Sequence, residues 1–283
     1  MRQNSGRETG RISPQIIFED SNLLVLDKPS HLVVLPTSHY PDLEKTLAGF
    51  VFEHLGISIK NIGKENRFGF VHRLDRDTSG VILVAKTSEF WEFLVKQFEE
   101  HKVSKTYQAL VWGDFDSQKI LFHFDTPMYQ STSSLRIQVE DEWLVIRSFL
   151  DRNPSNTQQF TVSQTGGEAI TQIKKLQSFQ FLTPTKKFEP MSFLEIKPLT
   201  GRTHQIRVHL KALGYPVAGD WLYGGRKKFR WVKERGLDHQ FLHAQKIEVP
   251  TPTGKSMIFE ALMPVDLKML LERCALAPIK ILG

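Results

Sequence analysis

The stretch FGFVHRLDRDTSGVILVAK, residues 68–86, places five charged or titratable side chains in a tight turn between two apolar runs. The runs, 68–71 and 81–84, are rich in β-forming residues, so the pattern predicts two strands joined by a turn. The turn holds two acids and three bases: Asp75, Asp77, His72, Arg73 and Arg76. A solvated hairpin tip would account for these charges. The alternative is a carboxylate whose ionisation is set by the cations around it.

The composition is that of an ordinary globular protein with a surplus of basic residues. Of 283 residues, 40% are hydrophobic and 24% are charged, so the chain can bury a sizeable core. Lys and Arg number 37 against 31 Asp and Glu, a net charge of +6 that suggests a polyanionic partner. The single cysteine, Cys274, rules out a disulfide framework and a cluster of thiolate metal ligands.

The N-terminal segment, residues 1–14, is polar, which predicts a disordered tail without the apolar core of a signal peptide. Since no apolar run reaches membrane-spanning length, we expect a cytoplasmic protein without a membrane partner. The remainder, 15–283, shows no internal repeat and no convincing linker, which predicts a single domain.

Strand and helix patterns are mixed without a regular βαβ rhythm, which favours an α+β fold over a doubly wound sheet. Alternating or short apolar runs predict strands over 16–18, 23–27 and 104–113. Helical periodicity predicts a helix over 88–103 with Ser88 as its N-cap, and a weaker helix over 265–276. Residues 191–216 predict strand, turn and helix, ended by Gly214, whereas 115–165 predict only short β-like pieces.

Motifs that would indicate a cofactor each lack a required residue. Gly-Lys-Ser at 254–256 resembles the end of a P-loop, but the glycine needed five residues earlier is Val249, so we expect a surface turn. His239 and His243 have the spacing of helical metal ligands, but the intervening position 240 carries glutamine, not the glutamate of a metalloprotease. We therefore expect packed histidines, no metal and no nucleotide or flavin cofactor.

A second basic element lies in 203–213, where helical spacing separates an apolar face from a basic flank. The flank consists of His204, Arg207 and Lys211. Arg202 lies in the preceding turn, where Thr200 or Gly201 can cap the helix. A surface helix with a basic stripe is the alternative.

The segment 221–236, WLYGGRKKFRWVKERG, interleaves basic and aromatic residues and is interpreted as a basic loop. Lys227, Lys228 and Arg230 can neutralise phosphates while aromatic rings stack on unpaired bases. A solvated loop whose aromatic residues anchor it to the core is the alternative.

Three stretches resemble the motifs of the RluA family of pseudouridine synthases. HRLDRDTSG at 72–80 resembles the catalytic signature, KTYQALVWG at 105–113 the second motif, and LTGRTHQIRVHL at 199–210 the third. The similarity spans about residues 16–267 in family order, with no RNA-binding S4 domain before it and a weak match over 115–165. The resemblance implies a largely antiparallel mixed sheet with flanking helices and a catalytic cleft. It also implies isomerisation of uridines in structured ribosomal or transfer RNA, without a cofactor.

The resemblance assigns roles to individual residues. Asp75 is the essential carboxylate, which attacks the sugar or the base or removes a sugar proton. Arg207 is its expected partner, with Arg202 as the rival, and Tyr107 packs on the target base and can help to move the proton at C5. Arg73 fills the space that the flipped uridine leaves. The other expected RNA contacts are His72, Arg202, His204, Lys227, Lys228 and Arg230. We expect a monomer.

Two functions from other classes remain open. A catalytically silent RNA-binding protein would not need the set of acid, tyrosine and arginine. A nucleoside or base hydrolase using Asp75 would release free uracil. Asp75 and Asp77 could also suggest a glycosidase pair, but such carboxylates usually come from separate segments and flank the scissile bond about 5 Å or more apart.

Overall fold

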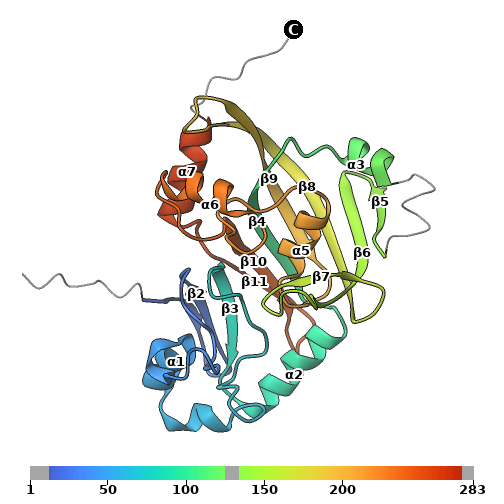
Figure 1. Cartoon of the computed structure of the whole chain (residues 1–283). Helices are drawn as coiled ribbons and strands as arrows, with labels where there is room; N and C mark the ends of the chain where they lie inside the picture. The colour runs from blue at the N-terminus through green and yellow to red at the C-terminus, as the bar shows by residue number, and fades with distance from the viewer. Residues whose placement is uncertain (1–12, 125–133, 276–283) are drawn as a thin grey trace, which may run out of the picture.

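The computed structural model describes residues 13–124 and 134–275. Most of the predicted tail, 1–14, therefore lies outside the described residues. Within them, eleven strands form one mixed sheet in the order β1-β2-β3-β10-β4-β9-β8-β6-β5, with β11 paired to β10 and β7 paired to β6 (Figure 1). All described strand pairs are antiparallel except β3 with β10. The predicted α+β class and the largely antiparallel mixed sheet are confirmed.

The strand bounds follow the chain. They are β1 (Gln15–Glu19), β2 (Leu23–Lys28), β3 (Ser79–Ala85), β4 (Ser104–Trp112), β5 (Arg136–Glu140), β6 (Trp143–Arg152), β7 (Phe160–Ser163), β8 (Gly167–Leu182), β9 (Phe188–Pro198), β10 (Leu242–Pro250) and β11 (Ser256–Glu260). The α-helices are α1 (Leu47–Leu55), α2 (Ser88–Glu99), α3 (Ser117–Phe124), α5 (Gln205–Ala212), α6 (Arg226–Lys233) and α7 (Val265–Ala275). Two short 3₁₀ helices, η1 (Leu43–Lys45) and η2 (Ile57–Asn61), flank α1.

Strands β2 and β3 are covered on both faces, which explains the continuous apolar run at 81–84. Leu24 and Ile82 pack in a cluster with α1, whereas Val25 and Leu83 pack in a different cluster with α2. Every residue of β3 is therefore buried. Burial on both faces holds β3 in place, and the turn that precedes β3 is therefore attached to a rigid strand.

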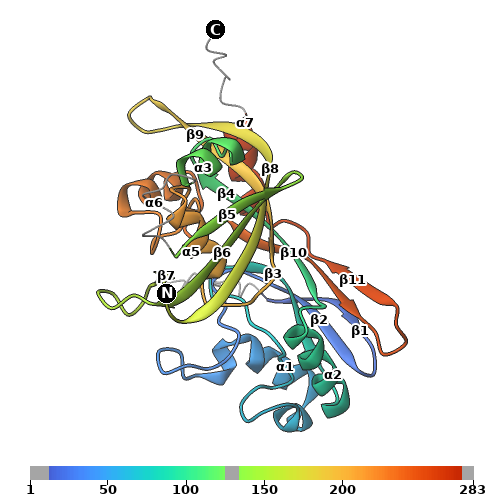
Figure 2. The same cartoon turned by 90° about the vertical axis from the view of Figure 1, so that its right-hand side faces the viewer.

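The centre of the sheet positions the three motifs. Residues 72–78, named here the acid–base turn, lead directly into β3, and β4 and β9 lie two and three places further along the sheet. Gly80 lets β3 approach β10 closely, since a Cβ there would lie 2.2 Å from the Ala244 carbonyl oxygen. On one side of these central strands lie α5 and α6, while the β10–β11 hairpin extends beside β1 (Figure 2).

Several sequence predictions need correction. The run 68–71 is not a strand: Phe68 and Gly69 have left-handed φ values of 50° and 77°, and Phe70 makes only an isolated β-bridge, to Val84. The N-cap of α2 is Thr87, not Ser88, because the Thr87 hydroxyl accepts the Phe90 amide at 3.2 Å. Neither Thr200 nor Gly201 caps α5; its N-cap is His204, whose backbone has a left-handed φ of 56°. The segment interpreted as a basic loop contains the two-turn helix α6, which buries Trp231 and Val232 in the core.

Other local predictions are confirmed. Gly214 ends α5: its amide and that of Tyr215 donate to the carbonyls of Lys211 and Leu210, the pattern of a Schellman motif. The stretch 254–256 belongs to the turn between β10 and β11, at the surface. The prediction of only short β-like pieces over 115–165 is wrong in one respect, because the described part of this region contains the helix α3 as well as the strands β5 to β7.

Candidate active site

A cavity of about 420 Å³ opens where the acid–base turn, β4 and the segment before α5 meet. Each of these elements carries one of the three motifs, and the volume is that of a typical small-molecule site. Seven of the predicted site residues line the cavity: Asp75, Tyr107, Arg207, Arg73, His72, Arg202 and His204. Folding therefore gathers residues from segments that are distant in the sequence.

Asp75 and Arg207 form the ion pair of this cavity. Arg207 Nη1 donates to Asp75 Oδ2 at 2.9 Å, and the two residues are 132 positions apart in the chain. The side chain of Arg207 is only 5% exposed, whereas that of Asp75 is 24% exposed. The carboxylate thus has one oxygen fixed by a buried cation while part of its surface faces the cavity.

A second carboxylate, Asp220, fixes the other edge of the same guanidinium. Arg207 Nε donates to Asp220 Oδ2 at 2.7 Å and Nη2 donates to Oδ1 at 3.0 Å. Asp220 Oδ1 also accepts the backbone amides of Leu222 and Tyr223, and the side chain of Asp220 has no exposed surface. Because this bidentate pair locks the guanidinium plane, Nη1 has one direction left, toward Asp75.

The sequence analysis missed Asp220 as a site residue. It lies 13 residues after Arg207, so no helical spacing links the two. The available signal was its place in the stretch 214–225, GYPVAGDWLYGG, between two predicted elements that carry basic residues.

The electrostatics of the cavity keep Asp75 ionised. Burial works to raise its pKa, but the guanidinium of Arg207, with further contributions from His204 and Arg73, outweighs burial and holds the pKa below its usual value. Burial likewise works to lower the pKa of Arg207, and the carboxylates of Asp220 and Asp75 outweigh it, so the net pKa is raised. An anion on a largely desolvated wall is therefore maintained at neutral pH.

His204 lies beside Asp75. The Tyr223 hydroxyl accepts the Phe160 amide at 2.8 Å and is hydrogen-bonded to His204 Nδ1 at 3.0 Å. His204 Nε2 is 4.0 Å from Asp75 Oδ2. Burial is the main cause that lowers the pKa of His204, which favours its neutral form.

Tyr107 projects from β4 into the cavity. Burial, and secondly the charge of Asp75, raise the pKa of its hydroxyl well above the usual value. The ring is thus a neutral phenol near an ionised carboxylate.

The remaining predicted contact residues on the cavity wall, Arg73, Arg202 and His72, differ in their exposure and in their hydrogen bonds. Arg73 is exposed, and Arg202 is exposed with its Nε bound to the Glu168 carbonyl oxygen at 2.9 Å. His72 Nε2 accepts the Leu83 amide at 3.0 Å, and burial, with Lys105 as the second cause, lowers its pKa to about 3. His72 is therefore a neutral wall residue, whereas the two arginines keep donors available.

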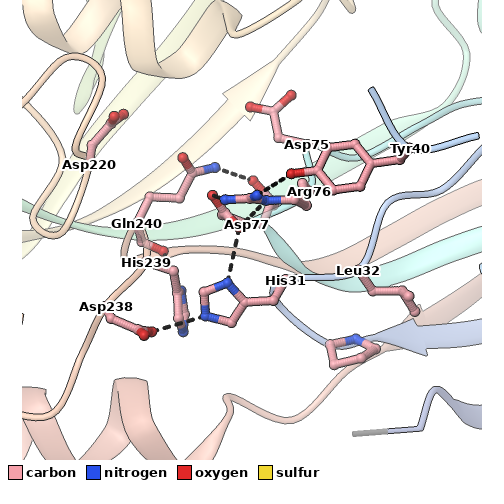
Figure 3. Close-up of polar contacts among 12 residues, drawn as sticks. His31, Leu32, Tyr40, Asp75, Arg76, Asp77, Asp220, Asp238, His239 and Gln240 are labelled. Carbon is pink, nitrogen blue, oxygen red and sulfur yellow. Dashed lines mark hydrogen bonds and ion pairs between the residues drawn. The ribbon is translucent and has the colours of Figure 1, made fainter. Parts of the chain in front are cut away.

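A separate ionic network shapes the acid–base turn (Figure 3). Arg76 donates two hydrogen bonds to Asp77, which also faces His31 at 3.2 Å. The Asp75 carboxylate points away from this network (Figure 3). Asp77 is therefore paired with its own cation, Arg76, which matches a role in loop shape rather than one half of a glycosidase pair.

The predicted basic residues of α6 do not line the cavity. Lys227 Nζ lies 4.8 Å from the centre of the Trp231 ring, and Lys228 Nζ lies 5.0 Å from that of Trp112. Arg230 is exposed on the same helix. Contact of these three residues with RNA stays a prediction, and it concerns the surface of α6 outside the cavity.

The structure also bears on metal and membrane predictions. His239 is bonded to Asp266, and His243 to Ser79, so both are packed histidines as expected. In residues 13–124 and 134–275, no group of three or more potential metal-ligating side chains is present. No helix in those ranges is long and apolar enough to span a membrane.

Comparison with known proteins places the chain among RNA-modifying enzymes. The sequence pattern described as RNA pseudouridylate synthase matches residues 22–212. The Ribosomal large subunit pseudouridine synthase D of Pseudomonas aeruginosa is 33% identical over 92% of this chain and 72% of its own length. The enzyme of that name from Borreliella burgdorferi is 37% identical over 74% of this chain and 54% of its own.

Solved structures share the fold. The chain aligns with Human RNA Pseudouridylate Synthase Domain Containing 1 at a TM-score of 0.60 and 24% identity, covering 89% of this chain and 84% of the human one. Human RNA Pseudouridylate Synthase Domain Containing 4 aligns at 0.57 and 22% identity, covering 92% of each.

Proposed function

The chain belongs to the RNA pseudouridylate synthase family, and from this premise we propose that its cavity isomerises a uridine of structured RNA with Asp75 as the essential carboxylate. The reaction breaks the bond between uracil N1 and sugar C1′, turns the base and rejoins it through C5. The observation that carries the assignment is the hydrogen bond from Arg207 to Asp75, because it keeps an ionised carboxylate on the cavity wall.

Each chemical route open to Asp75 requires the ionised form. Attack on C1′, attack on the base and removal of a sugar proton all use a carboxylate lone pair. A bound uridine would displace water and strengthen the effect of burial, which disfavours the charge. The guanidinium of Arg207 opposes that effect of burial, and Asp220 holds this guanidinium in place from its opposite edge.

Tyr107 is proposed to stack on the target base. Its raised pKa keeps the phenol protonated, which supports stacking and hydrogen bonding over action as a phenolate base. Arg73 and Arg202 are proposed to hold the flipped nucleotide, since both are exposed at the cavity and carry free donors. Flipping costs a few kcal/mol, which such contacts offset. His72 and His204 are proposed to contact the nucleotide as wall residues.

The proposed substrate is large-subunit ribosomal RNA. The names of the relatives in Pseudomonas aeruginosa and Borreliella burgdorferi specify that RNA, which favours it over transfer RNA. We further propose that residues 15–283 act as one catalytic domain, as a monomer in the cytoplasm.

The deciding experiment maps pseudouridine across cellular RNA with and without this protein, then treats the mapped RNA with purified enzyme. Nucleoside analysis of the digested product distinguishes the three functions. Pseudouridine in the digested RNA, without release of free uracil, supports the proposal. Free uracil would indicate a hydrolase, and bound but unchanged RNA would indicate a silent binding protein.

Neutralising Lys227, Lys228 and Arg230 to Gln on α6 is expected to weaken RNA binding. The slope of log affinity against log salt should flatten by about one unit per lost phosphate contact. The single-turnover rate at saturating RNA should change far less, because these side chains do not line the cavity. Filter binding across a salt series measures the slope. An unchanged slope would mean that α6 faces away from the RNA.

Asp220→Asn is expected to lower turnover about 10-fold or more while the apparent KM for RNA changes little. Asn keeps an oxygen for the Leu222 and Tyr223 amides but loses the charge that holds Arg207 in its plane. Single- and multiple-turnover kinetics separate the two parameters.

Asp266→Asn is the matched control for Asp220→Asn. It also removes a carboxylate that is hydrogen-bonded to a buried side chain, that of His239, but it lies outside the cavity. Equal losses of turnover in both variants would contradict a positioning role for Asp220.

A further inference from the structure

Lys105 is a cavity residue to which no role has yet been assigned. It lies two positions before Tyr107 on β4, and side chains two apart on a strand point to the same face. Both side chains line the cavity, whereas the intervening Thr106 is buried in the opposite direction. The strand therefore presents an ammonium group and an aromatic ring side by side to the same bound nucleotide.

The charge of Lys105 has no counter-ion among the described residues. Its Nζ donates to the Thr200 carbonyl oxygen at 3.3 Å, and no described carboxylate forms an ion pair with it. Arg207, by contrast, contacts two carboxylates, and Lys174 on β8 contacts Glu142. Burial without such compensation lowers the pKa of Lys105 to about 8. A desolvated cation of this kind is costly unless an anion arrives from outside.

Lys105 is not the hydrogen-bond partner of Asp75. That carboxylate is bonded by Arg207, whereas Lys105 is bonded to the Thr200 carbonyl oxygen and its charge acts on His72. Lys105 thus belongs to the His72 part of the wall. Its bond to Thr200 also ties β4 to the segment 199–204, which leads into α5 and hence to Arg207.

We propose that Lys105 forms a phosphodiester subsite, in which its ammonium binds one of the two phosphates that flank the target uridine. This inference rests on the proposed function. The phosphodiester is the only formally negative group of RNA, and an ammonium binds it as a point charge. The contact would set the position of the nucleotide backbone relative to Tyr107 and Asp75, so that the base meets the ring and the sugar meets the carboxylate.

The test combines Lys105→Met with chemically altered RNA. Stem-loops that contain the mapped uridine are made with a neutral methylphosphonate at its 5′ or its 3′ phosphate, and kcat/KM is measured for each. We expect Lys105→Met to lower kcat/KM on natural RNA by about 10- to 100-fold. One of the two methylphosphonates should lower the kcat/KM of the wild-type enzyme by a similar factor. The same methylphosphonate should lower the kcat/KM of Lys105→Met by less than about twofold, because the contact is already lost.

Two further variants complete the design. Lys105→Arg retains a cation and should recover most of the activity, which a purely structural loss would not predict. Lys174→Met removes a half-buried strand lysine outside the cavity and should stay within about twofold of wild type. Thermal melting of every variant confirms that the fold persists.

The outcomes are decisive in either direction. Two results would contradict the proposal. In the first, the loss of kcat/KM from Lys105→Met multiplies with the loss from each of the two methylphosphonates, so that no flanking phosphate contacts this lysine. In the second, Lys105→Met keeps full activity. If the wild-type protein forms no pseudouridine on any RNA, the proposed function itself fails. This result is distinguishable from an active wild-type enzyme whose activity is unchanged by Lys105→Met.

Discussion

Asp75→Asn is expected to abolish pseudouridine formation, by about 10⁴-fold or more, while RNA binding is largely retained. Asn preserves size and an oxygen that can accept the bond from Arg207 Nη1, but it carries no anionic lone pair for any of the three routes. The fold should tolerate the change because Arg207 keeps its bidentate pair with Asp220. Binding should persist because phosphate contacts, which dominate RNA affinity, lie elsewhere.

The measurement is nucleoside analysis of RNA incubated with excess variant, together with a binding titration. Asp77→Asn is a useful comparison, because it removes the neighbouring acid of the same turn, whose partners are Arg76 and His31. We expect it to act through loop order and to leave measurable turnover. Pseudouridine formed by purified Asp75→Asn would refute the assignment of the essential carboxylate.

Arg207→Met is expected to slow the chemical step about 100-fold or more even at saturating RNA. The variant loses the donor that aims Asp75 and the cation that opposes burial. It also leaves Asp220 buried without its partner, and breaking such a pair destabilises a fold by about 3–5 kcal/mol. Arg207→Lys is therefore measured beside it, since Lys keeps the charge but cannot bridge both carboxylates as a planar fork.

The pH dependence of the residual activity gives a second readout. In the wild type, the cations hold the pKa of Asp75 below its usual value, so the carboxylate stays ionised into mildly acidic solution. Without Arg207, burial raises that pKa, and more of the carboxyl group is protonated at a given acidic pH. The acid limb of the pH–rate profile should therefore move to higher pH in Arg207→Met. A reduced rate with an unmoved acid limb would mean that Arg207 does not control the ionisation of Asp75.

Arg202→Met is the matched comparison for Arg207→Met. Arg202 is exposed and bonded to a backbone carbonyl, so its loss should chiefly raise the RNA concentration required. The double variant of Asp75 and Arg207 should be no slower than Asp75→Asn alone, because the two act as one unit. A chemical step abolished by Arg202→Met and intact in Arg207→Met would exchange the two roles.

Local sequence patterns anticipated much of the site, because periodicity is a property of neighbouring residues. Alternation along 104–113 predicted the strand that presents Tyr107, and helical spacing put His204 and Arg207 on one flank. Lys105 was not singled out from the sequence, because nothing in the spacing shows that the face it shares with Tyr107 lines a cavity. Element type followed from pattern, whereas the surroundings of each face did not.

Helix ends and the basic segment were harder to predict for a physical reason. Thr87 and Ser88 are both good capping residues, and only the backbone geometry selects Thr87. In 221–236 the interleaved basic and aromatic residues were interpreted as a loop, but burial of Trp231 and Val232 against the core stabilises α6. Tertiary packing overrides weak local preference in such short helices.

The sequence by itself predicted the fold class and most of the strands and helices that carry the motifs, and its resemblance to a family named the acid, the tyrosine and the arginine as candidates. Only the tertiary structure decided which charges meet. Arg207 reaches Asp75 across 132 residues and is held by Asp220 from its other edge, and no local periodicity encodes either contact. The same holds for Lys105, because only the folded structure shows that no carboxylate of the described residues forms an ion pair with it. Ionisation depends on burial and on neighbouring charges in space, and these exist only once distant strands have paired.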